Sequence, residues 1–413
     1  MKLFIKLYHK IAASVNKVKL FLARERNLCY NEIKKQERNM KNKHFPEIKG
    51  KFGFGCMRFP TLENGEIDIP QVKLMFDLFL EAGFNYFDTA HGYHGGKSET
   101  TLRECLTSRY PRERYLITNK LSSNHFSCQE DIRPLFESQL EAVGVDYFDF
   151  YFMHAQDQNN FKQYKACRAY ETAMELKAEG KIRHLGISFH DRAYVLDQIL
   201  TEYPEVETVQ IQFNYFDYDD PSVEARKCYE VCQKHGVPAM VMEPVKGGSL
   251  VNLPDEADKI LRDLGEGSNA SYAIRFAAGF DGVAMVLSGM GSIDMVRDNV
   301  SYMKDFKPLT EAEYEGVMRV AEVFRAQNLI QCTSCAYCTE RCPKNIPIPA
   351  YFACYNATKT IGGWSYYSKL KADNVQGKIY DCIECGACER ACPQHLEIPK
   401  LLKEVRDNFE KND

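Results

Sequence analysis

The chain has 413 residues, a length that suits two or three ordinary domains, or one large barrel with an appendage. Hydrophobic residues make up 45% of it and charged residues 27%, close to globular averages, which excludes a disordered chain or a fibrous rod. The formal net charge of −4 gives no basic surface that would favour nucleic acid as the main partner. The unusual feature is the number of cysteines, sixteen.

Residues 1–49 form a basic N-terminal extension. The first 51 residues hold fourteen Lys or Arg against four Glu, and the cations recur at helical spacing among apolar side chains. Weak association with an anionic membrane surface therefore stays open, beside the simpler interpretation that residues 1–39 are dispensable. The sequence has neither a long uncharged apolar stretch for a transmembrane helix nor a clear export signal, so we expect a cytoplasmic protein.

Residues 50–305 alternate between short strand-like runs and amphipathic helical stretches, a pattern typical of a parallel sheet with crossover helices. The predicted strands are Phe52–Met57, Asn85–Asp88, Tyr115–Asn119, Phe148–Met153, His184–Ser188, Thr208–Phe213, Ala239–Met242 and Val283–Ser288. The predicted helices are Gln71–Ala82, Ser98–Ser108, Ile132–Val143, Phe161–Ala178, Ala193–Thr201, Ser222–His235, Ser268–Ala278 and Ile293–Met303. This α/β alternation favours a (β/α)8 TIM barrel over an open doubly wound sheet.

Residues 306–328 are predicted to be a linker, because Thr310 and Glu313 have the spacing of a capping box that begins a helix ending near Gln327. Residues 329–413 then contain an internal repeat. The run Cys-x2-Cys-x2-Cys-x3-Cys-Pro occurs twice, with an offset of 50 residues. This is the bacterial ferredoxin pattern for iron–sulfur clusters, and it predicts a small, mainly α-helical ferredoxin-like domain with two [4Fe-4S] clusters.

The cluster ligands can be assigned, because in this pattern the fourth cysteine of each run binds the other cluster. One cluster would take Cys332, Cys335, Cys338 and Cys392, and the second would take Cys382, Cys385, Cys388 and Cys342. A pair of zinc sites is the competing interpretation. It is less favoured, because zinc usually takes two Cys-x2-Cys pairs separated by a longer loop.

Polar residues follow three predicted barrel strands, at the end where barrel enzymes carry their active sites. They are Asp88 and Tyr93 after the second strand, Lys120 after the third and His154 after the fourth. In this order and spacing, the sequence resembles the aldo-keto reductases over residues 50 to about 305. The resemblance implies that these four residues are a catalytic tetrad, and that a nicotinamide cofactor binds without a Rossmann domain.

Reduction of a carbonyl group by hydride builds negative charge on oxygen, so the site needs a proton donor and groups that stabilise the charge. Tyr93 would be the donor, and we expect the ammonium group of Lys120 to lower the pKa of Tyr93. Asp88 would hold Lys120 in place, and His154 would orient the substrate carbonyl. The predicted activity is the reduction of an aldehyde or ketone to an alcohol, or the reverse.

The resemblance also implies a binding site for NADPH or NADH. The residues it assigns to this cofactor are Ser188, Gln210, Met242, Pro244, Gly247, Gly289, Met290 and Asn299. This chain departs from the family at several of these places. Phe189 replaces an Asn, Met242 stands where members often stack a Tyr, and Gly289 and Met295 stand where many members have a Lys and an Arg for the 2′-phosphate. The choice between NADPH and NADH stays open.

The two halves differ in electron chemistry, because a hydride carries two electrons whereas each cluster takes one. Three hypotheses follow: the clusters exchange electrons with a protein partner, they are structural or redox-sensing, or the barrel binds a small-molecule carbonyl substrate that accepts electrons singly. An alternative function is a non-catalytic redox or nucleotide sensor with a structural iron–sulfur module.

Overall fold

The computed structural model describes residues 42, 44–265, 267–327, 329–357, 367, 370 and 377–410. Its centre is a closed barrel of parallel strands in the order β1 to β8, with β1 paired to both β2 and β8. The strands are β1 (Phe52–Gly55), β2 (Tyr86–Asp88), β3 (Leu116–Leu121), β4 (Phe148–Gln156), β5 (Ile182–Phe189), β6 (Thr208–Gln212), β7 (Ala239–Met242) and β8 (Val283–Gly289). The predicted (β/α)8 barrel is confirmed. Of the predicted basic extension, residues 1–49, residues 1–41 and 43 lie outside the described residues.

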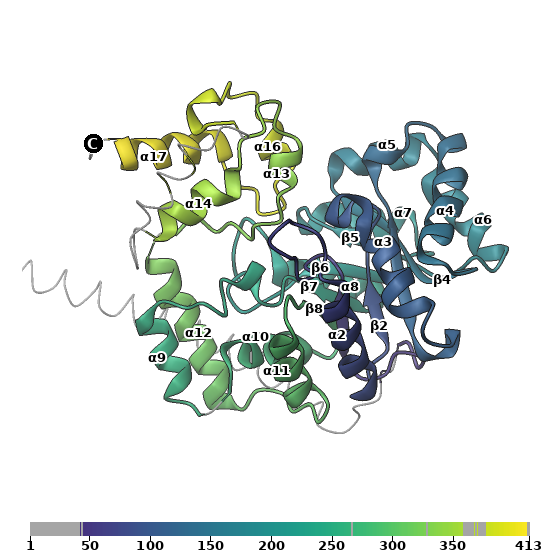
Figure 1. Ribbon diagram of the computed structural model, residues 1–413, viewed down its shortest axis with the longest axis horizontal. Helices are drawn as coiled ribbons and strands as arrows, with labels where there is room; N and C mark the ends of the chain where they lie inside the picture. Colours follow the sequence, from purple (N-terminus) through teal and green to yellow (C-terminus); the bar gives the residue numbers. More distant parts are fainter. Residues whose placement is uncertain are drawn as a thin grey trace, which may run out of the picture.

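Helices surround this barrel (Figure 1). They are α2 (Ile69–Glu81), α3 (Lys97–Leu102), α4 (Gln129–Val143), α5 (Gln158–Ala166), α6 (Ala169–Ala178), α7 (Ala193–Glu202), α8 (Ala225–His235), α9 (Asp255–Arg262), α10 (Asn269–Ala278) and α11 (Ile293–Met303). The prediction of one helix over Phe161–Ala178 is wrong. Arg168, with φ of 51°, adopts a left-handed backbone that a continuous helix does not tolerate, so α5 and α6 are separate.

The barrel interior is filled by side chains, as expected for eight strands. Tyr86, Phe150, Phe152, Met240 and Met285 belong to one buried cluster, and each has 0% exposure. Phe45 and Ile48, which precede β1, belong to the same cluster. A second and larger cluster joins the outer faces of the strands to the helices. Because the interior is packed, chemistry is confined to the rim at the carboxyl ends of the strands.

The linker helix forms where the sequence predicts. Helix α12 (Glu311–Ala326) begins at Thr310, whose Oγ1 accepts a hydrogen bond from Glu313 N at 3.3 Å while Glu313 Oε2 accepts one from Thr310 N at 2.7 Å. These reciprocal bonds satisfy backbone donors that a helix start leaves free. The helix packs against α9 (Figure 1) and ends just before the cysteine-rich region.

The C-terminal region has its own small core and lies over one end of the barrel (Figure 1). Its helices are α13 (Tyr337–Glu340), α14 (Ile348–Ala357), α16 (Ala387–Arg390) and α17 (Ile398–Glu410). Tyr351, Phe352 and Val405 are buried in this core. The short helices α13 and α16 each lie within one copy of the cysteine repeat, and the two are in contact.

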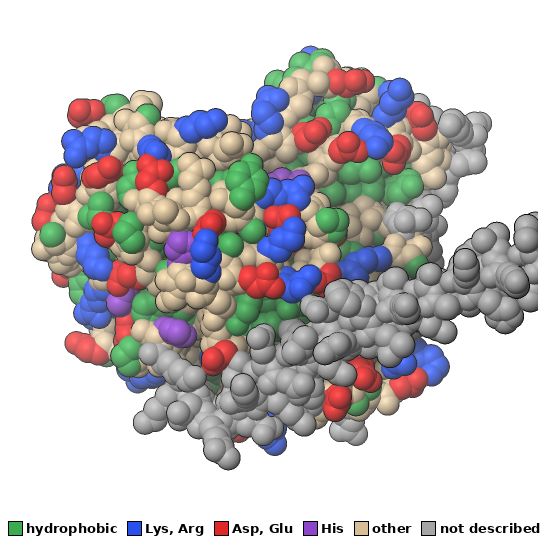
Figure 2. Space-filling model, turned by 180° about the vertical axis from the view of Figure 1, so that it is seen from behind, with side chains coloured by type: hydrophobic (Ala, Val, Ile, Leu, Met, Phe, Trp, Pro, Cys, Tyr) green, Lys and Arg blue, Asp and Glu red, His purple; other side chains and the backbone are tan. Residues whose placement is uncertain are grey.

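Charge is evenly distributed on the face seen in Figure 2, where basic and acidic side chains are interspersed. This agrees with the small net charge. Among the described residues, no helix combines the length and the apolar character needed to cross a membrane.

Candidate active site

The four predicted catalytic side chains meet at the carboxyl end of the barrel. Lys120 Nζ donates to Asp88 Oδ1 at 2.6 Å and lies 3.4 Å from the Tyr93 hydroxyl oxygen. The His154 ring contacts the Tyr93 ring edge to face, with 6.0 Å between ring centroids. The structure thus gathers an ammonium, a carboxylate and an imidazole around one phenol.

Burial shifts the pKa values of both Asp88 and Lys120. Their side chains are 6% and 0% exposed. Burial raises the pKa of Asp88 and lowers the pKa of Lys120, while the attraction between them opposes both shifts. Lys120 Nζ also donates to Thr89 O at 2.7 Å, and the Gln210 amide donates to Asp88 Oδ2 at 3.2 Å. These bonds offset the cost of burying the two charged groups.

The hydroxyl of Tyr93 is not acidified as the sequence predicted. Burial raises the pKa of Tyr93 well above its ordinary value, and contacts with Tyr337 and the negative charge of Asp88 act in the same direction. The net shift is opposite to the acidification predicted from the Lys120 ammonium group, because loss of hydration on burial is its largest cause. Tyr93 therefore keeps its proton over a wide pH range, which suits a proton donor.

His154 is a neutral imidazole. Burial, with the positive charge of Lys120 in the same direction, lowers the pKa of His154 well below its ordinary value. The Oγ of Ser122 lies 2.6 Å from His154 Nδ1. With Nδ1 engaged in this way, Nε2 is the ring nitrogen available to hydrogen-bond a substrate carbonyl.

A second tyrosine reaches Tyr93 from the C-terminal region. Tyr337 is the first residue of α13 and stands between Cys335 and Cys338 in the sequence. Its side chain lies beside that of Tyr93, and this contact raises the pKa of Tyr93. The cysteine-rich region therefore contacts the proposed proton donor directly.

A buried polar network fixes the same region to the rim of the barrel. Gln394 and Gln212, the last residue of β6, exchange amide hydrogen bonds of 3.0 Å and 2.8 Å. Lys246 Nζ donates to Gln394 Oε1 at 3.0 Å and to Asp217 Oδ1 at 2.6 Å. The side chains of Lys246 and Asp217 are 2% and 1% exposed, so this network is shielded from water.

Thr333 packs between two loops of the rim. Arg58 Nη2 donates to Thr333 O at 2.8 Å. Gly247 follows β7 with φ of 64°, and an ideal Cβ built on it would lie 2.3 Å from the same carbonyl oxygen. Glycine is required there for two reasons, its left-handed backbone and the close approach of the Thr333 backbone.

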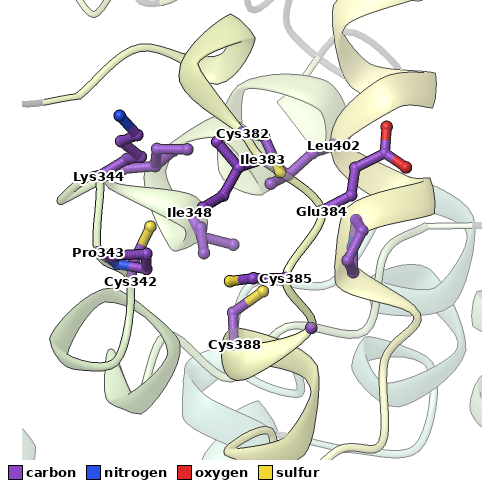
Figure 3. Close-up of a pocket in the computed structure, with 13 residues that line it drawn as sticks. Cys342, Pro343, Lys344, Ile348, Cys382, Ile383, Glu384, Cys385, Cys388 and Leu402 are labelled. Atoms are coloured by element: carbon purple, nitrogen blue, oxygen red, sulfur yellow. The ribbon is translucent and has the colours of Figure 1, made fainter.

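The predicted cluster cysteines line two pockets of the C-terminal region. One is lined by Cys342, Cys382, Cys385 and Cys388, and the sulfur atoms of Cys342, Cys385 and Cys388 face a common space in Figure 3. The other is lined by Cys332, Cys335, Cys338 and Cys392. In each pocket the fourth cysteine comes from the other copy of the repeat.

The two pockets enclose about 320 and 300 Å³ of space, solvent included. Apolar side chains complete their walls, Ile348 and Leu402 in one and Phe352 and Leu396 in the other. Four thiolate ligands around an apolar hollow fit a [4Fe-4S] cluster. In the described part of the chain, no three His, Cys, Asp or Glu side chains are arranged to hold a single metal ion.

Comparison with known proteins identifies both parts of the chain. The model of the aldo/keto reductase family matches residues 51–322, which is most of the chain. The chain belongs to the aldo/keto reductase family. A model described as a 4Fe-4S dicluster domain matches residues 331–397, and we call this segment the ferredoxin-type domain. The zinc interpretation of the cysteine repeat is therefore not supported.

Relatives within the aldo/keto reductase family are distant. The NADH-specific methylglyoxal reductase of Escherichia coli K12 is 27% identical over 207 residues, which cover 45% of this chain and 60% of that protein. The holo structure of aldo-keto reductase AKR11C1 from Bacillus halodurans has 26% identity and a TM-score of 0.53, covering 66% of this chain and 92% of that chain. An aldo-keto reductase from Klebsiella pneumoniae in complex with NADPH has 19% identity and a TM-score of 0.54, covering 67% and 91%, a likeness in fold alone.

The family resemblance assigns several side chains to a nicotinamide cofactor, and some of these are hydrogen-bonded or buried within the protein. Ser188 Oγ accepts from Ala155 N at 2.8 Å, and Gln210 donates to Asp88. Asn299 donates to Ser288 Oγ at 3.0 Å. Met290 has 0% exposure. These four side chains therefore already have hydrogen-bond partners or packing contacts within the protein.

The remaining assigned residues lie at the ends of β7 and β8 or in the loop after β7. Met242 is half-buried and Pro244 is buried. Gly247 is covered by Thr333, and the Arg58 side chain that holds Thr333 lies 3.3 Å from an ideal Cβ on Gly289. The ferredoxin-type domain thus covers Gly247, whereas Gly289 is exposed and lies against Arg58 of the barrel. At Gly247 the backbone of Thr333 lies where a dinucleotide would have to contact the glycine, so this position does not fit a bound dinucleotide.

Sequence analysis missed the contacts between the two domains. Tyr337, Thr333 and Gln394 carry no motif of their own, although each is within two residues of a predicted cluster ligand. Lys246 and Asp217 look like ordinary surface charges in the sequence. A polar residue beside a cluster ligand is the one local signal that would have singled out the first three.

Proposed function

We propose that the protein is a cytoplasmic oxidoreductase that reduces an aldehyde or ketone to an alcohol, or catalyses the reverse reaction, with Tyr93 as the general acid or base. The observation that supports this best is the convergence of Lys120 and His154 on Tyr93, with Lys120 Nζ 3.4 Å from the Tyr93 hydroxyl. This arrangement offers a proton and a positive charge at one point, which is what a developing alkoxide needs.

Each member of the tetrad has a distinct role in this proposal. Tyr93 donates its proton to the carbonyl oxygen, and the Lys120 ammonium stabilises the tyrosinate left behind. Asp88 holds Lys120 at 2.6 Å and balances its charge. The neutral imidazole of His154 hydrogen-bonds the carbonyl and orients it. In the reverse direction, the tyrosinate removes the proton of the alcohol.

The electron donor is a separate question. NADPH or NADH is the donor that the family implies, but the contacts of Thr333 at Gly247 do not favour a bound dinucleotide, so we derive no step through it. The two groups of four cysteines would hold two [4Fe-4S] clusters, which carry electrons singly. An electron-transfer protein would then be the partner that supplies or removes electrons.

Carbonyl reduction by the anaerobically reconstituted protein tests the proposal. Methylglyoxal and a panel of aldehydes and ketones would be offered with NADPH, NADH or dithionite as donor. We expect Tyr93→Phe to lower the rate by about 10² to 10⁴-fold, the usual contribution of a general acid. The matched control is Tyr194→Phe, because Tyr194 is 62% exposed. Equal rates for Tyr93→Phe and wild type, at equal iron content, would refute the role of Tyr93.

A further inference from the structure

We propose that the ferredoxin-type domain takes the place of a nicotinamide dinucleotide at the barrel rim, so that a conjugated carbonyl substrate at Tyr93 is reduced by electrons from the cysteine-bound clusters. The inference rests on the proposed function of Tyr93 and adds the electron donor and the substrate class.

The first support is the position of Thr333. Its carbonyl oxygen accepts from Arg58 at 2.8 Å and lies against Gly247. The Gly247 loop belongs to the edge that the resemblance assigns to the dinucleotide, whereas Gly289 at the end of β8 is exposed and lies against Arg58 of the barrel. A dinucleotide and this docked segment therefore compete for the space at Gly247.

The second support is the buried hydrogen-bond network that holds the ferredoxin-type domain against the barrel. If the domain left the rim, Gln212 and Lys246 would lose the bonds they make to Gln394. A buried donor or acceptor left without a partner costs about 1 to 3 kcal/mol. Such a network is typical of a fixed interface, and a domain that moved aside in every turnover would have to break it each time.

The third support is the sequence of the barrel at the cofactor positions. Phe189 and Met242 replace an amide and a ring that the family uses at the nicotinamide. Gly289 and Met295 stand in place of two cations for the 2′-phosphate, and Met295 is 52% exposed. The first two departures remove contacts to the nicotinamide and the other two remove contacts to the 2′-phosphate of NADPH, whereas the four residues of the tetrad are retained.

The fourth support is the link between the cluster loop and Tyr93. Tyr337 stands between the predicted ligands Cys335 and Cys338, and its side chain lies beside that of Tyr93. One residue thus separates the proposed proton donor from the pocket lined by Cys332, Cys335, Cys338 and Cys392. This pocket is the point from which electrons would enter the barrel site.

The electrons and protons of the reaction balance. Conversion of a carbonyl to an alcohol takes two electrons and two protons and forms one C–H and one O–H bond. Conversion of a quinone to a hydroquinone takes the same electrons and protons and forms two O–H bonds. Two reduced clusters, [4Fe-4S]⁺, supply one electron each and become [4Fe-4S]²⁺. Tyr93 gives one proton and regains it from solvent, which also supplies the second. A low-potential one-electron carrier protein, or dithionite in the test tube, restores the reduced clusters.

Because the clusters deliver electrons one at a time, only some classes of carbonyl compound can be the substrate. After the first electron the substrate is a radical, so it must spread the unpaired electron over a conjugated system. Quinones and aryl 1,2-dicarbonyls do this, whereas isolated ketones do not. The proposed class is therefore a conjugated carbonyl compound.

A nucleotide-binding measurement tests whether the docked ferredoxin-type domain excludes a dinucleotide from the barrel rim. The full-length protein with both clusters would be titrated anaerobically with NADPH and with NADH, and binding followed by calorimetry. We expect no saturable binding up to about 1 mM, a concentration at which an ordinary cofactor site would be filled. Saturable binding of either nucleotide in the micromolar range would overturn the inference.

A second measurement tests whether the reduced clusters transfer electrons to a substrate at Tyr93. The protein would be reduced with dithionite, freed of excess reductant and mixed with 9,10-phenanthrenequinone, while cluster reoxidation is followed by absorbance and electron paramagnetic resonance. We expect Tyr93→Phe to slow reoxidation by the quinone by about 10²-fold or more, the usual contribution of a general acid. Reoxidation by ferricyanide, which takes an electron without a proton, should be unchanged. The matched control is Tyr380→Phe, because Tyr380 is 42% exposed.

The outcomes separate the two proposals. Equal quinone rates in wild type and Tyr93→Phe would overturn the inference. If Tyr93-dependent carbonyl reduction proceeds with NADPH or NADH but not with reduced clusters, the proposed function stands and the inference fails. If no donor supports Tyr93-dependent reduction, both fail.

Discussion

Gln212 and Gln394 are 182 residues apart in sequence, yet their side-chain amides exchange two hydrogen bonds, of 3.0 Å and 2.8 Å. Lys246 Nζ adds a third bond to Gln394 Oε1. Gln394→Ala therefore leaves a buried amide and a buried ammonium without this partner. We expect it to lower the free energy of unfolding by about 1 to 3 kcal/mol, measured by denaturant unfolding of the cluster-containing protein under anaerobic conditions.

Two further variants make this prediction specific. Gln331→Ala is the matched control, because the Gln331 amide donates only two residues away, to Leu329 O, and little loss is expected. The double variant Gln212→Ala/Gln394→Ala should lose less than the sum of the two single losses, since both remove the same pair of bonds. Additive losses would show that the two amides do not stabilise each other.

The pair of Lys120 and Asp88 allows structural and catalytic roles to be separated. Lys120→Met leaves the Asp88 carboxylate buried without its cation, and we expect this to cost about 3 to 5 kcal/mol of unfolding free energy. Adding Asp88→Asn removes the unpaired charge and should restore most of the stability, but not carbonyl reduction. The measurements are denaturant unfolding and turnover of each variant. A fully stable Lys120→Met protein would argue against a buried ion pair.

The pKa shifts predict how carbonyl reduction depends on pH. Tyr93 must be protonated to act as an acid, and burial raises its pKa well above the ordinary value, so the rate should fall only at strongly alkaline pH. His154 must be neutral, and burial lowers its pKa well below the ordinary value, so its protonation matters only in acid. We expect a flat profile of kcat from about pH 6.5 to about pH 9. A steep change near pH 7 would place His154 in a more hydrated setting, because a hydrated tyrosine titrates only near pH 10.

The barrel was predictable because its signal is local. Each strand is a short apolar run and each helix an amphipathic stretch, and β1 to β8 arise in the predicted order. The break at Arg168 was not predictable, because its left-handed backbone occurs without the glycine that usually marks such a position. Helix α9 (Asp255–Arg262) was missed as well, since much of it is charged and its few apolar residues resemble those of a loop.

The residues that form the candidate site were predictable from the sequence, but the pKa of Tyr93 was not. Asp88, Tyr93, Lys120 and His154 follow strands in a family order, so their meeting at one rim follows from the barrel. The raised pKa of Tyr93 depends on burial and on Tyr337, and neither is encoded near Tyr93 in the sequence. For the same reason, the contact between Thr333 and Gly247 required the structure, because it depends on how two separately predicted domains dock.

The sharing of cysteines between the two copies of the repeat leads to a prediction about iron content. Each pocket draws its fourth cysteine from the other copy, so Cys392→Ala should remove the cluster of Cys332, Cys335 and Cys338 and leave about four of eight iron atoms. Cys392→Ala/Cys335→Ala should then keep one cluster, whereas Cys392→Ala/Cys385→Ala should lose both. Iron and sulfide analysis with electron paramagnetic resonance measures this, and Cys128→Ala, at an exposed cysteine outside both pockets, is the control. The opposite pattern in the two double variants would mean that each copy of the repeat binds a cluster by itself.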